Sequence, residues 1–269
     1  MNTGYQIVVC GGIVPDPLQT LEPVHTPTGP ALKNELVLPA TLDPWACHAL
    51  YEAAHLARQH PGSKVALVSI SPKQRLQQVM MTIAQKVPFE LVALDGAASG
   101  FTDPAETAAA LAEAINGLPG LNREKLLVFG GWESASRGAG VTLQYLAERL
   151  AISDVFMGVD ELRVQADGSL EIVERIEGGR QQASRCSGPP VVVGWATGKL
   201  PEPRNNPQIG MQNMRAIIPV LQRAKQVKIG AEGVSFASVA LPKQLRQTRI
   251  VRDATPEAIA REIVEWIKG

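Results

Sequence analysis

Short apolar runs of strand length alternate with helix-like stretches over most of the first 195 residues. The runs are rich in β-branched residues and show no polar alternation, which is typical of strands buried on both faces of a sheet. They lie at residues 6–9, 64–70, 90–94, 126–129 and 191–195. Strands that alternate with helices are joined by right-handed crossovers, so this order predicts an α/β fold with a mainly parallel sheet and flanking helices. Ligands of such sheets bind at the carboxyl ends of the strands, where we therefore expect the functional loops.

Helix start signals stand between these runs. Asp43-Pro44 and Asp103-Pro104 each place a capping Asp before a Pro that suits the first helical turn. The expected helices of this part of the chain span residues 44–59, 72–85, 105–116 and 138–150.

The pattern changes after residue 159. Two alternating segments, 161–165 and 170–174, flank an Asp167-Gly168 turn and predict a β-hairpin. Residues 198–248 are rich in Pro, Gly, Asn and Gln and show little periodicity. This composition favours a segment that packs against another chain. A final helix with one apolar face is expected to begin at Thr255-Pro256.

Composition excludes several classes of partner. The 26 basic residues are balanced by 26 acidic ones and aromatic residues make up only 4%, so we expect no nucleic-acid partner. Cys10, Cys47 and Cys186 are far apart and form no CxxC pair, which argues against disulfides or a zinc site and favours a reducing compartment.

The apolar runs are too short to insert into a membrane, and residues 5–10 read as a strand without a targeting segment before it. A bacterial cytoplasm is the expected location.

No catalytic constellation stands out. His48 and His55 share a face of one expected helix, but no Glu or Cys completes a metal-ligand spacing. The patterns GxSxG, GxxxxGK[ST] and HExxH are absent. Cys10 has no basic neighbour in sequence and reads as a small core residue rather than a nucleophile. We therefore expect no bond-making catalysis by this chain.

The most informative segment is the glycine-rich stretch 129–142, which follows a buried strand and leads into a helix. Glycines let the backbone turn sharply and approach a ligand, and the amide groups at a helix start attract anions. The Arg137 guanidinium can pair with a phosphate through two hydrogen bonds. Two interpretations stay open on this segment alone, namely a nucleotide-contacting loop and an ordinary glycine-rich turn.

Taken in order, these features resemble the β-subunit family of electron-transfer flavoproteins. The resemblance is collinear over nearly the whole chain, and its separate pieces are short. The pieces are the opening strand that ends in Val14-Pro15-Asp16, the helix start Asp43-Pro44-Trp45-Ala46, the turn Val68-Ser69-Ile70-Ser71-Pro72, the pair Gly178-Gly179 after the hairpin, and Pro203-Arg204 followed by Met214-Arg215-Ala216.

The resemblance implies a fold like that of the adenine nucleotide alpha hydrolases, with an added β-hairpin and an extended C-terminal arm. It implies a heterodimer in which a larger α-subunit holds the redox FAD, while this chain seats AMP, a second FAD or nothing. Such a heterodimer carries electrons from a flavin dehydrogenase to a quinone-linked oxidoreductase of the respiratory chain. The implied organisation is a nucleotide-binding-type domain over residues 1–197, a partner-recognition loop over 198–218, and a C-terminal arm and helix over 219–269 that pack on the α-subunit.

The resemblance also assigns roles by position. The residues implied to contact a nucleotide are Cys10, Asp43, Pro44, Trp45, Ala46, Ile70, Gly131, Trp132, Ser134, Ser136, Arg137, Gly138, Gly140 and Thr142. The residues implied to meet a partner are Pro203, Arg204, Ile209, Met211 and Met214, with Ile209 and Met211 as alternatives for the anchoring apolar residue.

The sequence departs from the family pattern in the segments that matter most for ligands. Glu133, Ser136, Gly138 and Val141 stand where the family has Gln, Asp, Asp and Gln, and residues 85–88 replace its Met-Gly-Ala-Asp. These departures predict that AMP is held differently or not at all, and that the electron donor differs from the common acyl-CoA dehydrogenases. The alternative of another class is a stand-alone protein of the same fold that binds or hydrolyses adenine nucleotides.

Overall fold

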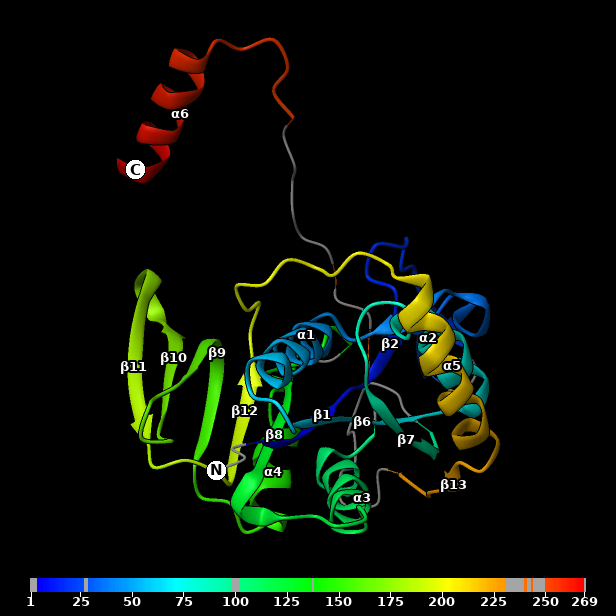
Figure 1. Cartoon of the computed structure of the whole chain (residues 1–269). Helices are drawn as coiled ribbons and strands as arrows, with labels where there is room; N and C mark the ends of the chain where they lie inside the picture. Colours follow the sequence, from blue (N-terminus) through cyan, green and yellow to red (C-terminus); the bar gives the residue numbers. More distant parts are fainter. Residues whose placement is uncertain are drawn as a thin grey trace.

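The computed structural model of the 269-residue chain describes residues 4–26, 29–97, 102–136, 138–230, 240, 243 and 250–268. Within this part of the chain, nine strands form one large sheet in the order β11-β10-β9-β12-β8-β1-β6-β7-β13, and two small two-stranded sheets stand beside it (Figure 1). The large sheet consists of β1 (Gln6–Cys10), β6 (Lys64–Ser71), β7 (Glu90–Asp95), β8 (Leu126–Gly131), β9 (Val155–Val164), β10 (Leu170–Ile176), β11 (Arg180–Cys186), β12 (Val191–Trp195) and β13 (Lys225–Gln226). The small sheets pair β2 (Ile13–Pro15) with β5 (Ala40–Leu42) and β3 (Pro23–Thr26) with β4 (Gly29–Leu32).

The described helices lie on both faces of the large sheet, except for the last one, which is drawn apart from it (Figure 1). They are α1 (Pro44–Gln59), α2 (Lys73–Ile83), α3 (Pro104–Asn116), α4 (Thr142–Arg149), α5 (Pro207–Gln222) and α6 (Pro256–Lys268), with short 3-10 turns η1 (Glu35–Val37), η2 (Arg123–Lys125) and η3 (Glu177–Gly179). From β9 to β13 through β12, β8, β1, β6 and β7, every neighbouring pair of strands is parallel. The expectation of a mainly parallel sheet with flanking helices is therefore confirmed.

Strand β1 lies at the centre of the sheet, and its side chains divide the core in two. Gln6 pairs with Lys64 of β6 on one side and with Leu126 of β8 on the other. Ile7 and Val9 face the core under α1, α2 and α5, whereas Val8 and Cys10 face the core under α3 and α4. Both faces of the strand are buried, which explains its apolar run without alternation.

The start signals read in the sequence form as expected. The Asp43 side chain accepts the Trp45 amide proton at the beginning of α1, and Asp103 does the same for Ala105 at the beginning of α3. The expected hairpin is also confirmed, because β9 and β10 pair antiparallel around Gly168. Strand β11 then extends this antiparallel edge.

Two expectations about helices were wrong. The helix expected from residue 138 begins at Thr142, because Gly138 and Gly140 have φ angles of 66° and 65° that no α-helix accommodates. The stretch 198–248 was expected to lack clear elements, yet it contains α5. The side chain of Asn206 caps α5 through the amides of Gln208 and Ile209, and the internal Gly210 and Pro219 hid the helix from a periodicity argument.

Helix α5 is fixed to the turn that follows α2. The amide of Asn213 is 8% exposed and donates to the carbonyl oxygens of Ala84 and Val87, at 2.8 and 2.9 Å. The backbone amide of Asn206 donates a hydrogen bond to the carbonyl oxygen of Gln85. These bonds satisfy carbonyl groups next to the C-terminus of α2, so α5 closes that end of the domain.

Helix α6 is drawn apart from the sheet in Figure 1, and none of its described side chains is buried. Its cap forms as expected, since the Ala258 amide donates to the Thr255 hydroxyl. Its apolar face is exposed, with Trp266 72% and Ile267 79% accessible.

The Asn213 contacts lead to a stability prediction. Replacement of Asn213 by Leu should lower the free energy of unfolding by about 2 kcal/mol, because the Ala84 and Val87 carbonyls lose their donors while buried. The neighbouring exposed Gln212→Leu is the control and should change it by less than about 0.5 kcal/mol. Urea denaturation measures both, and equal effects of the two substitutions would contradict this role of Asn213.

Candidate functional site

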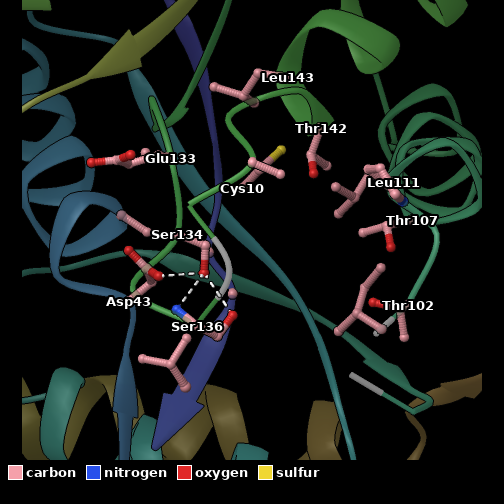
Figure 2. A pocket seen from close by; sticks show the side chains of 18 of the residues that line it. Cys10, Asp43, Thr102, Thr107, Leu111, Glu133, Ser134, Ser136, Thr142 and Leu143 are labelled. Atoms are coloured by element: carbon pink, nitrogen blue, oxygen red, sulfur yellow. Dashed lines mark hydrogen bonds between the residues drawn. The ribbon is translucent and has the colours of Figure 1, made fainter. Parts of the chain in front are cut away.

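A cavity of about 190 Å³ opens at the carboxyl edge of the central strands, where the parallel-sheet argument places ligand sites (Figure 2). Six segments of the described chain build its wall. They are the loop after β1, the start of α1, the end of β6, the segment from the end of β7 into α3, the glycine-rich loop between β8 and α4, and the segment after β13.

Asp43 ties two of these segments together. Its side chain is 3% exposed, and one carboxyl oxygen accepts the Trp45 amide proton at 3.1 Å within α1. The other oxygen accepts the hydroxyl of Ser134 at 2.8 Å and the amide of Ala135 at 2.9 Å (Figure 2). One buried carboxyl group therefore caps α1 and also fixes the loop after β8.

Burial raises the pKa of the Asp43 carboxyl above its ordinary value. The hydrogen bonds from Ala135, Ser134, Trp45 and Ala46 act in the opposite direction, because they stabilise the charged form. The carboxyl group is held by these donors and is therefore a structural acceptor rather than a free base.

The glycine-rich loop lies very close to α1. A Cβ atom on Gly131 would lie 2.8 Å from the Cβ of Trp45, so only glycine fits there without displacing the helix. This close approach brings the loop within reach of Asp43.

Helix α4 begins at the cavity without a side-chain cap. Its N-cap residue is Val141, whose side chain makes no capping hydrogen bond, and Val141, Thr142 and Leu143 line the cavity. The first amide groups of a helix have no partner inside the helix and attract negative charge. This part of the wall can therefore hold an anionic group.

The ionisable side chains at the described wall have different environments. Asp43 and Glu133 bring carboxyl groups to the lining, and in Figure 2 the Glu133 carboxylate points away from Thr102 and Thr107. Burial raises the pKa of the Cys10 thiol to about 12, so this cysteine stays protonated at neutral pH. This agrees with the expectation of an unreactive core cysteine.

The structure brings most of the expected nucleotide residues to this one cavity. Those that line it are Cys10, Asp43, Ala46, Ile70, Gly131, Trp132, Ser134, Ser136, Gly140 and Thr142. Pro44, Trp45 and Gly138 lie beside it but do not line it, and Arg137 lies outside the described residues. Whether any of them binds a nucleotide stays a prediction.

Sequence reasoning missed the contribution of α3. Thr102, Thr107 and Leu111 line the cavity from its start, and Ile229 lines it from beyond β13. The α3 residues could have been found, because β7 ends at the same edge of the sheet as β1 and the Asp103-Pro104 signal was recognised. Nothing in the sequence around Ile229 pointed to this edge.

The residues expected to meet a partner lie at and before α5. Pro203 and Arg204 precede the helix, whereas Ile209, Met211 and Met214 belong to it. Met211 is 62% exposed, Ile209 is half-buried, and Met214 packs against the core. Of the three, Met211 protrudes most.

The segment before α5 is tied to the domain by ion pairs and backbone bonds. The Glu52 carboxylate of α1 accepts the Lys199 amide at 3.2 Å and also the amide of Leu200. Lys86 forms an ion pair with Glu202 at 2.6 Å. The chain therefore reaches α5 along a defined path.

Among the described residues, no group of three or more His, Cys, Asp or Glu side chains is placed to hold a metal ion. In the same part of the chain, no helix has both the length and the apolarity needed to cross a lipid bilayer.

Comparison with known proteins gives one match. Residues 34–216, well over half of the chain, match the sequence model of the electron transfer flavoprotein domain. The matched range includes α1, the glycine-rich loop and the first part of α5. A search of curated proteins finds no match.

The raised pKa of Asp43 predicts a pH effect. Between the ordinary and the raised pKa, the folded protein keeps a proton that the unfolded chain has lost, so wild-type stability should fall as pH rises through this range. Asp43→Asn removes this titration. The unfolding free energy of the wild type, minus that of Asp43→Asn, should therefore decrease with rising pH in urea titrations from pH 4 upward. A difference that does not change with pH would contradict the prediction.

Proposed function

Because the chain belongs to the electron transfer flavoprotein family, we propose that it is the β-type subunit of an FAD-containing heterodimer that carries electrons. In this proposal a larger α-subunit holds the redox FAD. The heterodimer takes electrons from a flavin dehydrogenase and passes them to a quinone-linked oxidoreductase of the respiratory chain, in a bacterial cytoplasm. The chain itself makes and breaks no bonds.

The observation that carries the proposal is the family match together with the unburied apolar face of α6. Ile259, Ile263, Trp266 and Ile267 lie on one side of this helix and are all exposed. An amphipathic helix gains most of its stability from burying such a face against another element. The family relationship favours a larger companion chain as the protein that buries this apolar face.

In this proposal the chain is a scaffold that holds its ligand and its partner proteins in place. The FAD supplies the electron-transfer chemistry when bound. Its cavity residues hold a nucleotide, and its surface residues meet other proteins.

The donor set of the cavity fits an AMP moiety. The uncapped start of α4 suits a phosphate, and the apolar side chains of Ile70, Leu111 and Ile229 suit a base or the carbon face of a sugar. The cavity of about 190 Å³ is smaller than the roughly 300–1,000 Å³ of most ligand pockets. This size favours a single AMP moiety over a fully enclosed dinucleotide.

Met211 is the residue that we propose as the anchor for a partner protein. It is the most exposed of the apolar candidates. The helix that carries it, α5, is fixed to the domain by the buried hydrogen bonds of Asn213. Methionine adapts its shape to an apolar pocket. The changed turn at residues 85–88 bonds directly to α5, which supports an electron donor other than the common acyl-CoA dehydrogenases.

The alternative function is a stand-alone protein that binds or hydrolyses adenine nucleotides. It would depend on the same cavity and on the uncapped start of α4.

Co-expression separates the two functions. The chain should be purified alone and together with the product of a neighbouring α-subunit gene. The proposal expects a 1:1 heterodimer with the absorption spectrum of bound flavin. A colourless monomer that ignores the α-subunit and binds nucleotide by itself would support the alternative.

The α6 face provides a more specific test. A double substitution, Ile263→Ser with Trp266→Ser, should weaken assembly with the α-subunit at least tenfold, because two exposed apolar side chains of the same face are lost. The exposed polar pair Glu257→Ser with Arg261→Ser is the matched control on the same helix. Analytical ultracentrifugation of the mixed chains measures the affinity, and equal effects of the two double variants would count against docking by α6.

A further inference from the structure

A short chain of hydrogen bonds runs from the buried Asp43 to the cavity. The Ser134 hydroxyl is 2.8 Å from a carboxyl oxygen of Asp43 and 3.0 Å from the hydroxyl of Ser136 (Figure 2). All three residues line the cavity, and Ser136 is the exposed member of the chain. We refer to Asp43, Ser134 and Ser136 as the hydroxyl relay.

The direction of this relay follows from counting protons. A hydroxyl group has one proton to donate. The Ser134 hydroxyl donates its proton to a carboxyl oxygen of Asp43. The contact between the two hydroxyl groups must then use the proton of Ser136, and the Ser136 amide also points to the Ser134 oxygen, at 3.3 Å.

The cavity end of the relay is consequently an acceptor. Once the Ser136 proton is engaged, its oxygen offers only lone pairs to a ligand. The Asp43 carboxyl group lies two hydrogen bonds behind it. A phosphate, which is anionic and accepts hydrogen bonds, is disfavoured here, whereas a hydroxyl or amino group that donates is favoured.

The uncapped start of α4 has the opposite character. Its amide groups donate and attract negative charge, and Thr142 lies well apart from Ser136 in Figure 2. The two ends of the cavity thus favour different ligand groups. Together they can orient a ligand that carries a hydrogen-bond donor at one end and an anion at the other.

We propose that the hydroxyl relay binds a hydrogen-bond donor of the ligand, a sugar hydroxyl or an exocyclic amino group, and that it does not bind the phosphate. This rests on the proposed nucleotide seat and adds the orientation of the nucleotide within it. The glycine-rich loop was expected to attract an anion such as a phosphate. The relay divides this loop into a part that binds a hydrogen-bond donor and a part that binds an anion.

The test measures binding to the full-length chain by isothermal titration calorimetry. The probes are AMP, adenosine, 2′-deoxy-AMP, 3′-deoxy-AMP and IMP. The variants are Ser136→Ala, which removes the acceptor, and Ser153→Ala as the matched control. Ser153 is exposed, precedes β9 and does not line the cavity.

Ser136→Ala should weaken AMP and adenosine equally, by about fivefold, because the relay does not contact the phosphate. One of the modified nucleotides should lack the group that donates to Ser136. This probe should bind the wild type about fivefold more weakly than AMP does, and Ser136→Ala should not weaken its binding further. A deoxy-nucleotide in this role identifies a sugar hydroxyl, and IMP identifies the amino group. Ser153→Ala should leave all affinities unchanged.

Three results would overturn the inference in different ways. A loss on AMP but none on adenosine would mean that Ser136 holds the phosphate. Good binding of AMP with no effect of Ser136→Ala on any probe would remove the relay from the site while leaving the nucleotide seat intact. Failure of the wild type to bind either AMP or adenosine would remove the nucleotide seat itself, and the relay proposal with it.

Discussion

The buried carboxyl group of Asp43 is the contact on which the arrangement of this edge of the sheet depends. It joins the first turn of α1 to a loop about ninety positions later in the chain, through the Trp45 amide, the Ser134 hydroxyl and the Ala135 amide. A carboxylate is suited to this position because it accepts all three donors at once. An amide side chain has only one oxygen and would leave one of these donors facing a second donor. The shape of the cavity wall thus follows from the acceptor capacity of one residue.

The chain's departures from its family pattern have structural partners. The resemblance implies a different turn at residues 85–88, and this turn receives hydrogen bonds from Asn206 before α5 and from Asn213 within it. The resemblance implies an acidic residue at the position of Ser136, and Ser136 is here part of a relay that ends at the carboxyl group of Asp43. In both cases the altered residue contacts a second segment of the chain, so the alterations form connected sets rather than isolated losses.

The sequence predicted the parts of the fold that local rules control. Buried strands such as 126–129 and the Asp-Pro starts of α1 and α3 could be recognised, because burial on two faces and helix capping leave local patterns. Helix α5 could not be recognised, since Gly210 and Pro219 lower its intrinsic propensity and its stability comes from tertiary bonds of Asn213. For the cavity, the glycine-rich loop was visible in the sequence. The bonds that connect Asp43 with Ser134 are long-range and have no local pattern.

The sheet also separates two surfaces. Helix α5 packs with α1 and α2 on one layer of the core, whereas α3 and α4, which line much of the cavity, belong to the other layer. A substitution on the outer side of α5 therefore changes side chains that do not border the cavity. In the proposed function Met211 meets the redox partner and the cavity holds the nucleotide. Selection for a new partner would then act on α5 without changing the cavity, so the two properties would be free to diverge at different rates among related proteins.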